Sequence, residues 1–189
     1  SLWPGSDQVW NPYFTMNGEG GVTLSYFLNF VPERAVRIAY AASFGIDKIQ
    51  NDMRRLIIPE LAKYKGISVR EKTAREILNS YGIEARLVCD PVFLVDSSKF
   101  KIFVDNDCNI GQNDEVFVYL LHKKEKVGNQ VCDYLRRNYG YQIGVNLDIL
   151  GVETWLCKLK KAAFVVTNSF HATAFAVMFH VPFISVLIE

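Results

Sequence analysis

The sequence has no excess of charge of either sign. Its 189 residues hold 21 lysines and arginines against 20 aspartates and glutamates, so the formal net charge is +1. The balance also holds along the chain, because residues 1–95 carry 11 basic and 10 acidic side chains and residues 96–189 carry 10 of each. Proteins that bind duplexes or membrane surfaces usually have a basic stretch or face. We therefore expect no nucleic acid among the partners of this chain.

Long apolar runs and the common cofactor motifs are missing as well. A membrane-spanning helix needs about 20 mostly apolar residues, and polar residues and Pro182 interrupt the most apolar stretch, 162–188. We therefore expect no integral membrane segment. The sequence has no G-x-G-x-x-G, G-x-x-x-x-G-K-[ST], H-E-x-x-H or G-x-S-x-G motif, and these patterns mark dinucleotide, P-loop, zincin and hydrolase sites. We expect neither a bound cofactor nor a metal.

The four cysteines show no pairing pattern. Cys89, Cys108, Cys132 and Cys157 lie 19, 24 and 25 residues apart, and no C-x-x-C occurs. Zinc sites and the disulfide frameworks of secreted domains use closer spacing. The spacing predicts four reduced thiols in a cytoplasmic protein.

What the sequence has is enough apolar material for a core, since half of its residues are hydrophobic and 13% are aromatic. Apolar periodicity predicts strands at 36–42, 67–69, 86–89, 116–121, 142–145, 164–166 and 183–187. It predicts helices at 46–57 (ending before Pro59), 74–81, 126–139, 153–161 and 170–179, the last apolar nearly all round and therefore buried. Strands that alternate with helices indicate an α/β fold with parallel sheets and flanking helices. A polar, turn-rich stretch after residue 96 divides the chain into two domains, 1–95 and 96–189.

Polar residues collect where the predicted strands end. In open α/β sheets, ligands bind outside the carboxyl ends of the strands. Four strand ends carry such residues, namely Ser43, the pair Arg70-Glu71, Asp90, and the segment 167–171. The last segment joins an apolar strand to an apolar helix through Thr167, Asn168 and Ser169. The free N–H groups and the dipole of a helix start favour phosphate or carboxylate.

Each candidate residue has a functional and a structural interpretation. His171 could donate to an anion or transfer a proton, or it could be a core histidine satisfied by a backbone carbonyl. Arg70 could bind a carboxylate or phosphate with two hydrogen bonds, or it could pair with Glu71 or a nearby helix. Asp90, before Pro91, is typical of a turn, and Asp7 could accept a sugar hydroxyl or form an Asx turn.

Five segments occur in one order along the chain: 5–12 (GSDQVWNP), 39–45 (AYAASFG), 67–71 (ISVRE), 90–94 (DPVFL) and 166–172 (VTNSFHA). Together they resemble the polysaccharide pyruvyl transferases. The resemblance implies a GT-B-like architecture of two Rossmann-like lobes. It also implies transfer of pyruvate from phosphoenolpyruvate to a sugar of a cell-surface or exported glycan, which gives a ketal and phosphate.

The resemblance also assigns roles to residues. Arg70 matches the position expected to bind the donor, and His171 matches the catalytic position in the late helix-start motif. We assign Asn168 and Ser169 to the phosphate, and Asp7, Ser6, Ser43 and Glu71 to the substrates, with Asp7 and Ser43 facing the acceptor. Phosphoenolpyruvate is then a co-substrate, and the acceptor is a saccharide. We expect a cytoplasmic protein, peripheral to the inner membrane if the acceptor is lipid-linked.

The sequence departs from the family pattern at two places. Many members have Arg-Leu-His where this chain has Ser169-Phe170-His171. The glycine-rich segment that precedes the S-D-Q-V-W motif in the family is not in this sequence either. The resemblance therefore covers the middle of a family member, and we expect this stretch by itself to be inactive or weak. Two other functions stay open: a nucleotide-sugar glycosyltransferase of the same fold, with Glu153 at the ribose, and a non-catalytic glycan-binding module.

Overall fold

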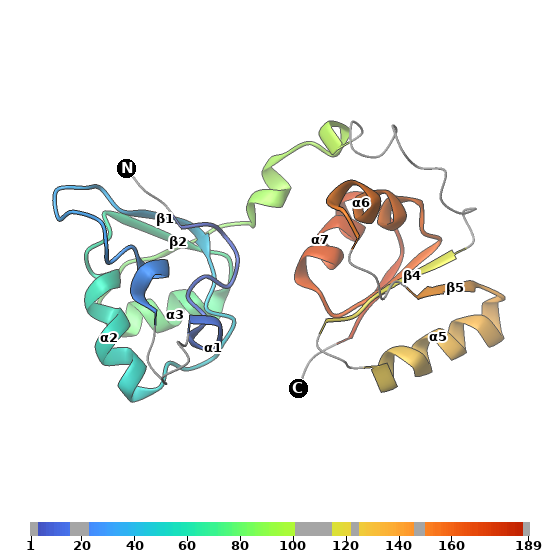
Figure 1. Ribbon diagram of the computed structural model, residues 1–189, viewed down its shortest axis with the longest axis horizontal. Coiled ribbons are helices and arrows are strands. Elements are labelled where there is room, and N and C mark those ends of the chain that lie inside the picture. Colours follow the sequence, from blue (N-terminus) through green and yellow to red (C-terminus); the bar gives the residue numbers. More distant parts are fainter. Residues whose placement is uncertain (1–3, 16–22, 101–114, 122–124, 146–149, 187–189) are drawn as a thin grey trace. The chain divides into compact units, whose positions relative to one another are not determined.

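The structure is a computed structural model that describes residues 4–15, 23–100, 115–121, 125–145 and 150–186. The chain divides into two compact units, Ser1–Leu94 (unit 1) and Val95–Glu189 (unit 2). Each unit has its own parallel sheet with helices packed on it (Figure 1). The predicted α/β fold with parallel sheets and flanking helices is confirmed.

Unit 1 is built on a three-stranded sheet in the order β1-β2-β3. The strands are β1 (Ile38–Ala42), β2 (Gly66–Val69) and β3 (Arg86–Leu87), and both pairings are parallel. The helices α2 (Asn51–Leu61) and α3 (Lys72–Ser80) connect them and cover the same face of the sheet (Figure 1). Short helical turns complete the unit: α1 (Pro12–Thr15), η1 (Leu24–Phe27) and η2 (Pro91–Leu94).

An aromatic cluster ties the amino-terminal segment of unit 1 to its core. Trp10 is fully buried, stacks on Phe27 with ring centroids 6.2 Å apart, and lies 5.5 Å from Phe44. Its backbone N–H donates to the carbonyl of Ser43 at 3.1 Å. The segment that the sequence indicated as a loop is therefore anchored at the end of β1.

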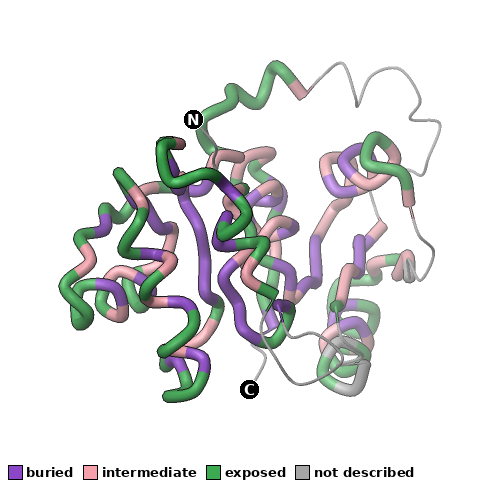
Figure 2. Tube along the Cα trace, turned by 60° about the vertical axis from the view of Figure 1, so that its left-hand side comes forward, coloured by how far each residue is buried: buried purple, intermediate pink, exposed green. Residues whose placement is uncertain are grey.

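In Figure 2, buried and exposed stretches alternate along the helices, as expected when one helix face packs inward.

Helix α2 corrects one prediction, because it contains Pro59 instead of ending before it. A proline inside a helix loses one backbone hydrogen bond. Leu61 is fully buried beyond it, in line with Ile57 and Met53, and this packing keeps the last turn helical. Glu60 accepts a hydrogen bond from the buried Arg37 at 2.9 Å. Burial opposes ionisation of Glu60, but hydrogen bonds from Lys63 and Arg37 outweigh it and lower the pKa of its carboxyl.

Unit 2 has a four-stranded parallel sheet in the order β5-β4-β6-β7. The strands are β4 (Glu115–Tyr119), β5 (Gln142–Val145), β6 (Phe164–Thr167) and β7 (Phe183–Ser185). Helix α5 (Glu125–Tyr139) covers one face, and α6 (Val152–Lys161) and α7 (Phe170–Met178) cover the other (Figure 1). A short turn, η3 (Ser97–Phe100), precedes them. The strand order reverses between β4 and β6, and such a switch point is where open α/β sheets bind ligands.

Helix α7 packs on the sheet through its alanines. Ala172, Ala174 and Ala176 are buried, whereas Phe170 and Val177 are exposed. The prediction that this helix is buried nearly all round is therefore only half right. Ala172 and Ala176 share a buried cluster with Val165 of β6, and Phe175 packs against that cluster.

The cysteines correct a second prediction. Cys89 and Cys132 are free, but Cys157 is disulfide-bonded, with a partner outside the described residues. The spacing of cysteines does not reveal which thiols a fold brings within bonding distance, so the expectation of four reduced thiols is wrong at Cys157. In the described residues, no helix combines the length and apolar character needed to cross a bilayer.

Candidate functional site

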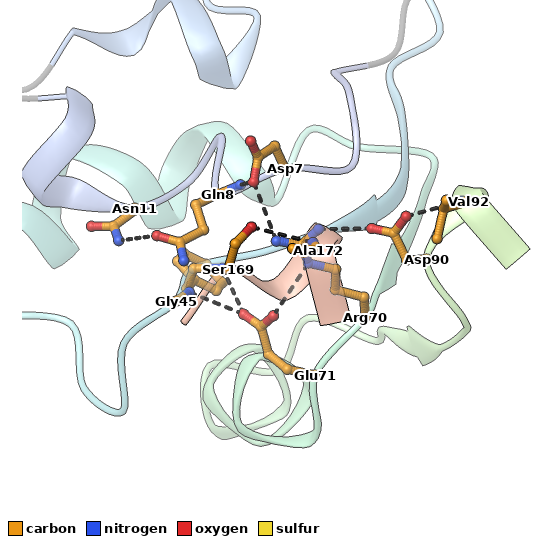
Figure 3. Close-up of polar contacts among 11 residues, drawn as sticks. Asp7, Gln8, Asn11, Gly45, Arg70, Glu71, Asp90, Val92, Ser169 and Ala172 are labelled. Carbon is orange, nitrogen blue, oxygen red and sulfur yellow. Dashed lines mark hydrogen bonds and ion pairs between the residues drawn. The ribbon is translucent and has the colours of Figure 1, made fainter. Parts of the chain in front are cut away.

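The carboxyl edge of the unit 1 sheet gathers four charged side chains. Arg70 and Glu71 directly follow β2, Asp90 follows β3, and Asp7 comes from the amino-terminal segment that Trp10 anchors. Figure 3 draws the guanidinium of Arg70 with contacts to all three carboxylates. The side chain of Arg70 is only 5% exposed. Its positive charge is therefore buried and is neutralised by these carboxylates.

The three carboxylates hold Arg70 unequally. Nη1 of Arg70 lies 2.7 Å from Oδ2 of Asp90, a carboxylate that is 2% exposed. Nη2 lies 3.3 Å from Oδ1 of Asp7, which is 72% exposed, and Nε lies 4.0 Å from Oε2 of Glu71. The sequence offered Glu71 as an ion-pair partner, but the short and buried contact is the one to Asp90.

Asp90 combines the predicted turn contact with an ion pair that its sequence context does not indicate. The turn interpretation is correct, because its Oδ1 accepts a hydrogen bond from the N–H of Val92 at 3.0 Å. Its other oxygen, however, binds Arg70. The strand register explains the contact: Val69 of β2 pairs with Leu87 of β3, so the residues that follow these two strands meet at one edge.

Glu71 holds the loop that follows β1. Its Oε1 accepts hydrogen bonds from the N–H groups of Phe44 at 2.7 Å and Gly45 at 3.1 Å. Gly45 has φ +61° and lies against the side chain of Gln8, where a Cβ would come within 2.5 Å. Ser43 is buried in the same loop. The structure thus brings Ser43 and Glu71 together, and it leaves Ser6 partly exposed beside Asp7.

A bulge at the end of β1 sets the course of this loop. The register of β1 against β2 shifts between Ala39 and Ala42, and Ala41 has φ +52° although it is not glycine. The Ser68 hydroxyl donates to the carbonyl of Ala39 at 3.2 Å and accepts from the N–H of Ala41 at 3.1 Å. Bulges commonly re-aim the chain beside functional sites. Nothing in the sequence pattern indicated this one.

The carboxyl edge of unit 2 is built from neutral groups that bind backbone. Asn168 accepts from the N–H of Leu121 at 2.6 Å and donates to its carbonyl at 2.8 Å. The hydroxyl of Thr167 donates to the carbonyl of Tyr119 at 2.6 Å and accepts from the N–H of Ser169 at 3.0 Å. Three of these bonds clamp the ends of β4 and β6 together at the switch point, and the fourth lies within the turn that follows β6.

Helix α7 begins directly after the residues of this clamp. Ser169 is the N-cap, and its hydroxyl accepts from the N–H of Ala172 at 3.3 Å, as in the bond drawn in Figure 3. His171 lies in the first turn, is partly buried, and meets the ring of Phe170 edge-on at 5.4 Å. The structure therefore places Asn168, Ser169 and His171 at one helix start. That start combines a dipole that favours anions with a side chain able to move a proton.

Two other features of the described residues do not coincide with these edges. A cavity of about 530 Å³ in unit 1 is lined by the first residues of β1, β2 and β3 and by the segments that precede β2 and β3, toward the opposite ends of the strands. No group of three His, Cys, Asp or Glu side chains in the described residues is arranged to hold a metal ion. The carboxylates of Asp7, Glu71 and Asp90 contact a guanidinium instead.

Comparison with known families decides the relationship of this chain. The family described as "Polysaccharide pyruvyl transferase" has a sequence model that matches residues 2–188. The chain belongs to the polysaccharide pyruvyl transferase family. The match spans the edges of both sheets, so the resemblance carried by the five segments is confirmed. No curated protein matches the chain.

Proposed function

We propose that this member of the family transfers pyruvate from phosphoenolpyruvate to a sugar of a cell-surface or exported polysaccharide. The observation that carries the proposal is the family match, which includes a histidine at a helix start and an arginine at a strand end. A transferase that handles an anionic donor needs a proton donor and a cation. His171 and Arg70 are the residues of those types at the two edges.

The chemistry adds two sugar hydroxyls to one carbon of the donor. An acid protonates the methylene carbon of phosphoenolpyruvate, which makes the enol carbon electrophilic. One hydroxyl oxygen bonds to that carbon, the carbon–phosphate oxygen bond breaks, and the second hydroxyl oxygen closes the ketal. The two hydroxyl protons leave with the phosphate and with the base that takes them. Each step requires stabilisation of developing charge more than covalent participation by the protein.

We assign His171 as the acid for the enol or for the leaving phosphate, and Arg70 to an anionic group of the donor. The N-terminus of α7, capped by Ser169, would bind the phosphate. Asn168 would support that site indirectly, because both ends of its amide bind Leu121. Asp7, Ser6, Ser43 and Glu71 are proposed for substrate binding, with Asp7 the most exposed carboxylate of the Arg70 group.

We place the reaction in the cytoplasm, on a saccharide that would bring the protein to the inner membrane if it is lipid-linked. Disulfides are rare in the cytoplasm, so the bond at Cys157 is unexpected for a cytoplasmic protein. A thiol titration of the denatured protein, isolated from cytoplasmic extract under alkylating conditions, tests it. Four alkylated cysteines are expected if the compartment keeps the chain reduced.

The donor is tested first by binding, which does not depend on turnover. Phosphoenolpyruvate should raise the melting temperature of the protein, whereas nucleotide sugars should leave it unchanged. The reverse result would identify a nucleotide-sugar glycosyltransferase. Turnover is then measured as phosphate release with a β-galactoside or mannoside acceptor, and mass spectrometry should find the pyruvate ketal. Saccharide binding with neither donor binding nor phosphate release would indicate a glycan-binding module.

A further inference from the structure

The contacts of Arg70 carry an inference that rests on the proposed function and deepens it. We propose that Asp90 and Asp7 have opposite roles toward the guanidinium. Asp90 is a positioning residue that holds Arg70 permanently, and Asp7 is an internal anion that the donor displaces from Arg70.

The Asp90 contact has the features of a permanent one. It is the shortest of the three ion pairs of Arg70, at 2.7 Å, and the Asp90 side chain is 2% exposed. The second oxygen of Asp90 is fixed by the N–H of Val92. Both oxygens of this carboxylate are thus engaged inside unit 1. Breaking a buried pair leaves an uncompensated buried charge, which is strongly unfavourable, so an incoming ligand would not displace Asp90.

The Asp7 contact has the features of an exchangeable one. Its distance to Arg70 is 3.3 Å and its side chain is 72% exposed, so water competes with the buried guanidinium for this carboxylate. Exposed ion pairs contribute little to stability. Oδ1 of Asp7 also accepts from the N–H of Gln8 at 2.8 Å, which gives the carboxylate a partner that does not depend on Arg70. Asp7 can therefore leave the guanidinium at low cost.

Charge balance gives a reason for the exchange. Asp7, Glu71 and Asp90 contribute three negative charges around the one positive charge of Arg70. A further anion added to this group would face the repulsion of these three carboxylates. If Asp7 moves away, its carboxylate is replaced by the chemically equivalent carboxylate, or the phosphate, of the donor. The guanidinium then keeps Asp90 behind it and exchanges one exposed anion for another.

The test compares Asp7→Asn with Asp90→Asn by isothermal titration of phosphoenolpyruvate. Asn at position 7 can keep the bond from Gln8 but removes the competing charge, so we expect the donor Kd to fall about two- to fivefold, the range that corresponds to an exposed ion pair. Asp90→Asn keeps an acceptor for Val92 but frees Arg70 from its anchor, so we expect the Kd to rise about tenfold or more. Glu76→Gln is the matched control, because it removes one exposed acid of unit 1, which lies 3.5 Å from the ammonium group of Lys72. Its Kd should equal that of the wild type.

Several results would overturn the proposal. An unchanged or higher Kd for Asp7→Asn contradicts the exchange. If that variant also loses kcat, Asp7 keeps only its proposed role toward the acceptor. A wild-type Kd in Asp90→Asn contradicts the positioning role. If Asp90→Asn unfolds, Asp90→Glu serves in its place and should weaken binding while the circular dichroism spectrum stays native.

The proposed function can fail separately. If a nucleotide sugar binds instead of phosphoenolpyruvate and Asp7→Asn tightens its binding, the exchange at Arg70 stands and the donor assignment falls. If neither phosphoenolpyruvate nor a nucleotide sugar binds the wild type, both are overturned.

Discussion

The carboxyl edges of the two sheets differ in the kind of side chain that they carry and in what those side chains bind. In unit 1 the edge consists of ionised side chains that satisfy one another, with Arg70 buried among Asp7, Glu71 and Asp90. In unit 2 the edge consists of neutral side chains, chiefly Thr167 and Asn168, that bind backbone groups of the neighbouring strand. The first edge consists of paired charges, and the second holds the ends of neighbouring strands in place.

This difference follows from what each sheet has at its edge. The described strands of unit 1 run in sequence order, and its site gains residues from loops and from the distant amino-terminal segment. Unit 2 reverses its strand order between β4 and β6, and hydrogen bonds from the residues after β6 join the carboxyl ends of these two neighbouring strands. Changes of charge should therefore affect unit 1 most, and changes of hydrogen-bonding capacity should affect unit 2 most. The predictions below test this division.

The largest effect is expected at His171 in unit 2. His171→Ala removes the proposed acid, and general acids contribute roughly 10²–10⁴-fold to rate. We expect kcat of the active protein to fall by that amount, measured as phosphate release from phosphoenolpyruvate, while the donor Kd changes little.

His180→Asn is the control for this experiment. His180 follows the same helix, is exposed, and has φ +58°, a conformation that asparagine tolerates. Its kcat should match that of the wild type. A His171→Ala variant with near-normal kcat would remove the catalytic role from unit 2.

The next effect is on the stability of unit 1. Asp90→Ala leaves the guanidinium of Arg70 without its buried partner, and breaking such a pair costs about 3–5 kcal/mol. Asp7→Ala breaks the exposed pair with the same guanidinium, for which about 1 kcal/mol or less is expected. Urea unfolding of both variants measures the two values. Equal losses would mean that burial does not distinguish the two carboxylates, and the charge argument for unit 1 would fail.

A smaller effect is expected when the clamp of unit 2 is removed. Asn168→Ala deletes both hydrogen bonds to Leu121. Because these bonds are exposed, each should contribute only its net value of about 0.5–1.5 kcal/mol. Asn138→Ala is the matched control, because its amide makes one exposed bond to the carbonyl of Tyr134. Urea unfolding should show a loss for Asn168→Ala and almost none for Asn138→Ala. Similar values would show that the clamp does not stabilise the switch point.

The sequence predicted those parts of the two edges that local patterns determine. Apolar runs placed the strands, and the polar residues after them placed Arg70 at one edge and His171 at the other. Interactions between distant residues were not predictable in the same way. The pairing of Arg70 with Asp90 depends on strand register, and the bulge at Ala41 depends on the hydroxyl of Ser68 in another strand.

Two errors have the same origin. Pro59 stays in a helix because Leu61 packs in the core, and Cys157 forms a disulfide that the spacing of the cysteines does not indicate. In both cases tertiary packing overrides a local rule.

The smallest stability effect is expected at Ser169, where the comparison can be made sharpest. Ser169→Ala removes the N-cap of α7 and should cost about 1 kcal/mol in urea unfolding. Ser169→Asp keeps a capping oxygen for the N–H of Ala172 and adds a charge that the helix dipole favours. That variant should be at least as stable as the wild type. It should nevertheless bind phosphoenolpyruvate more weakly, because the carboxylate at position 169 would compete with the donor for the helix start, just as Asp7 competes for Arg70. If Ser169→Asp binds the donor as tightly as the wild type, the start of α7 is not the phosphate site, and the neutral edge of unit 2 serves only to hold the strands together.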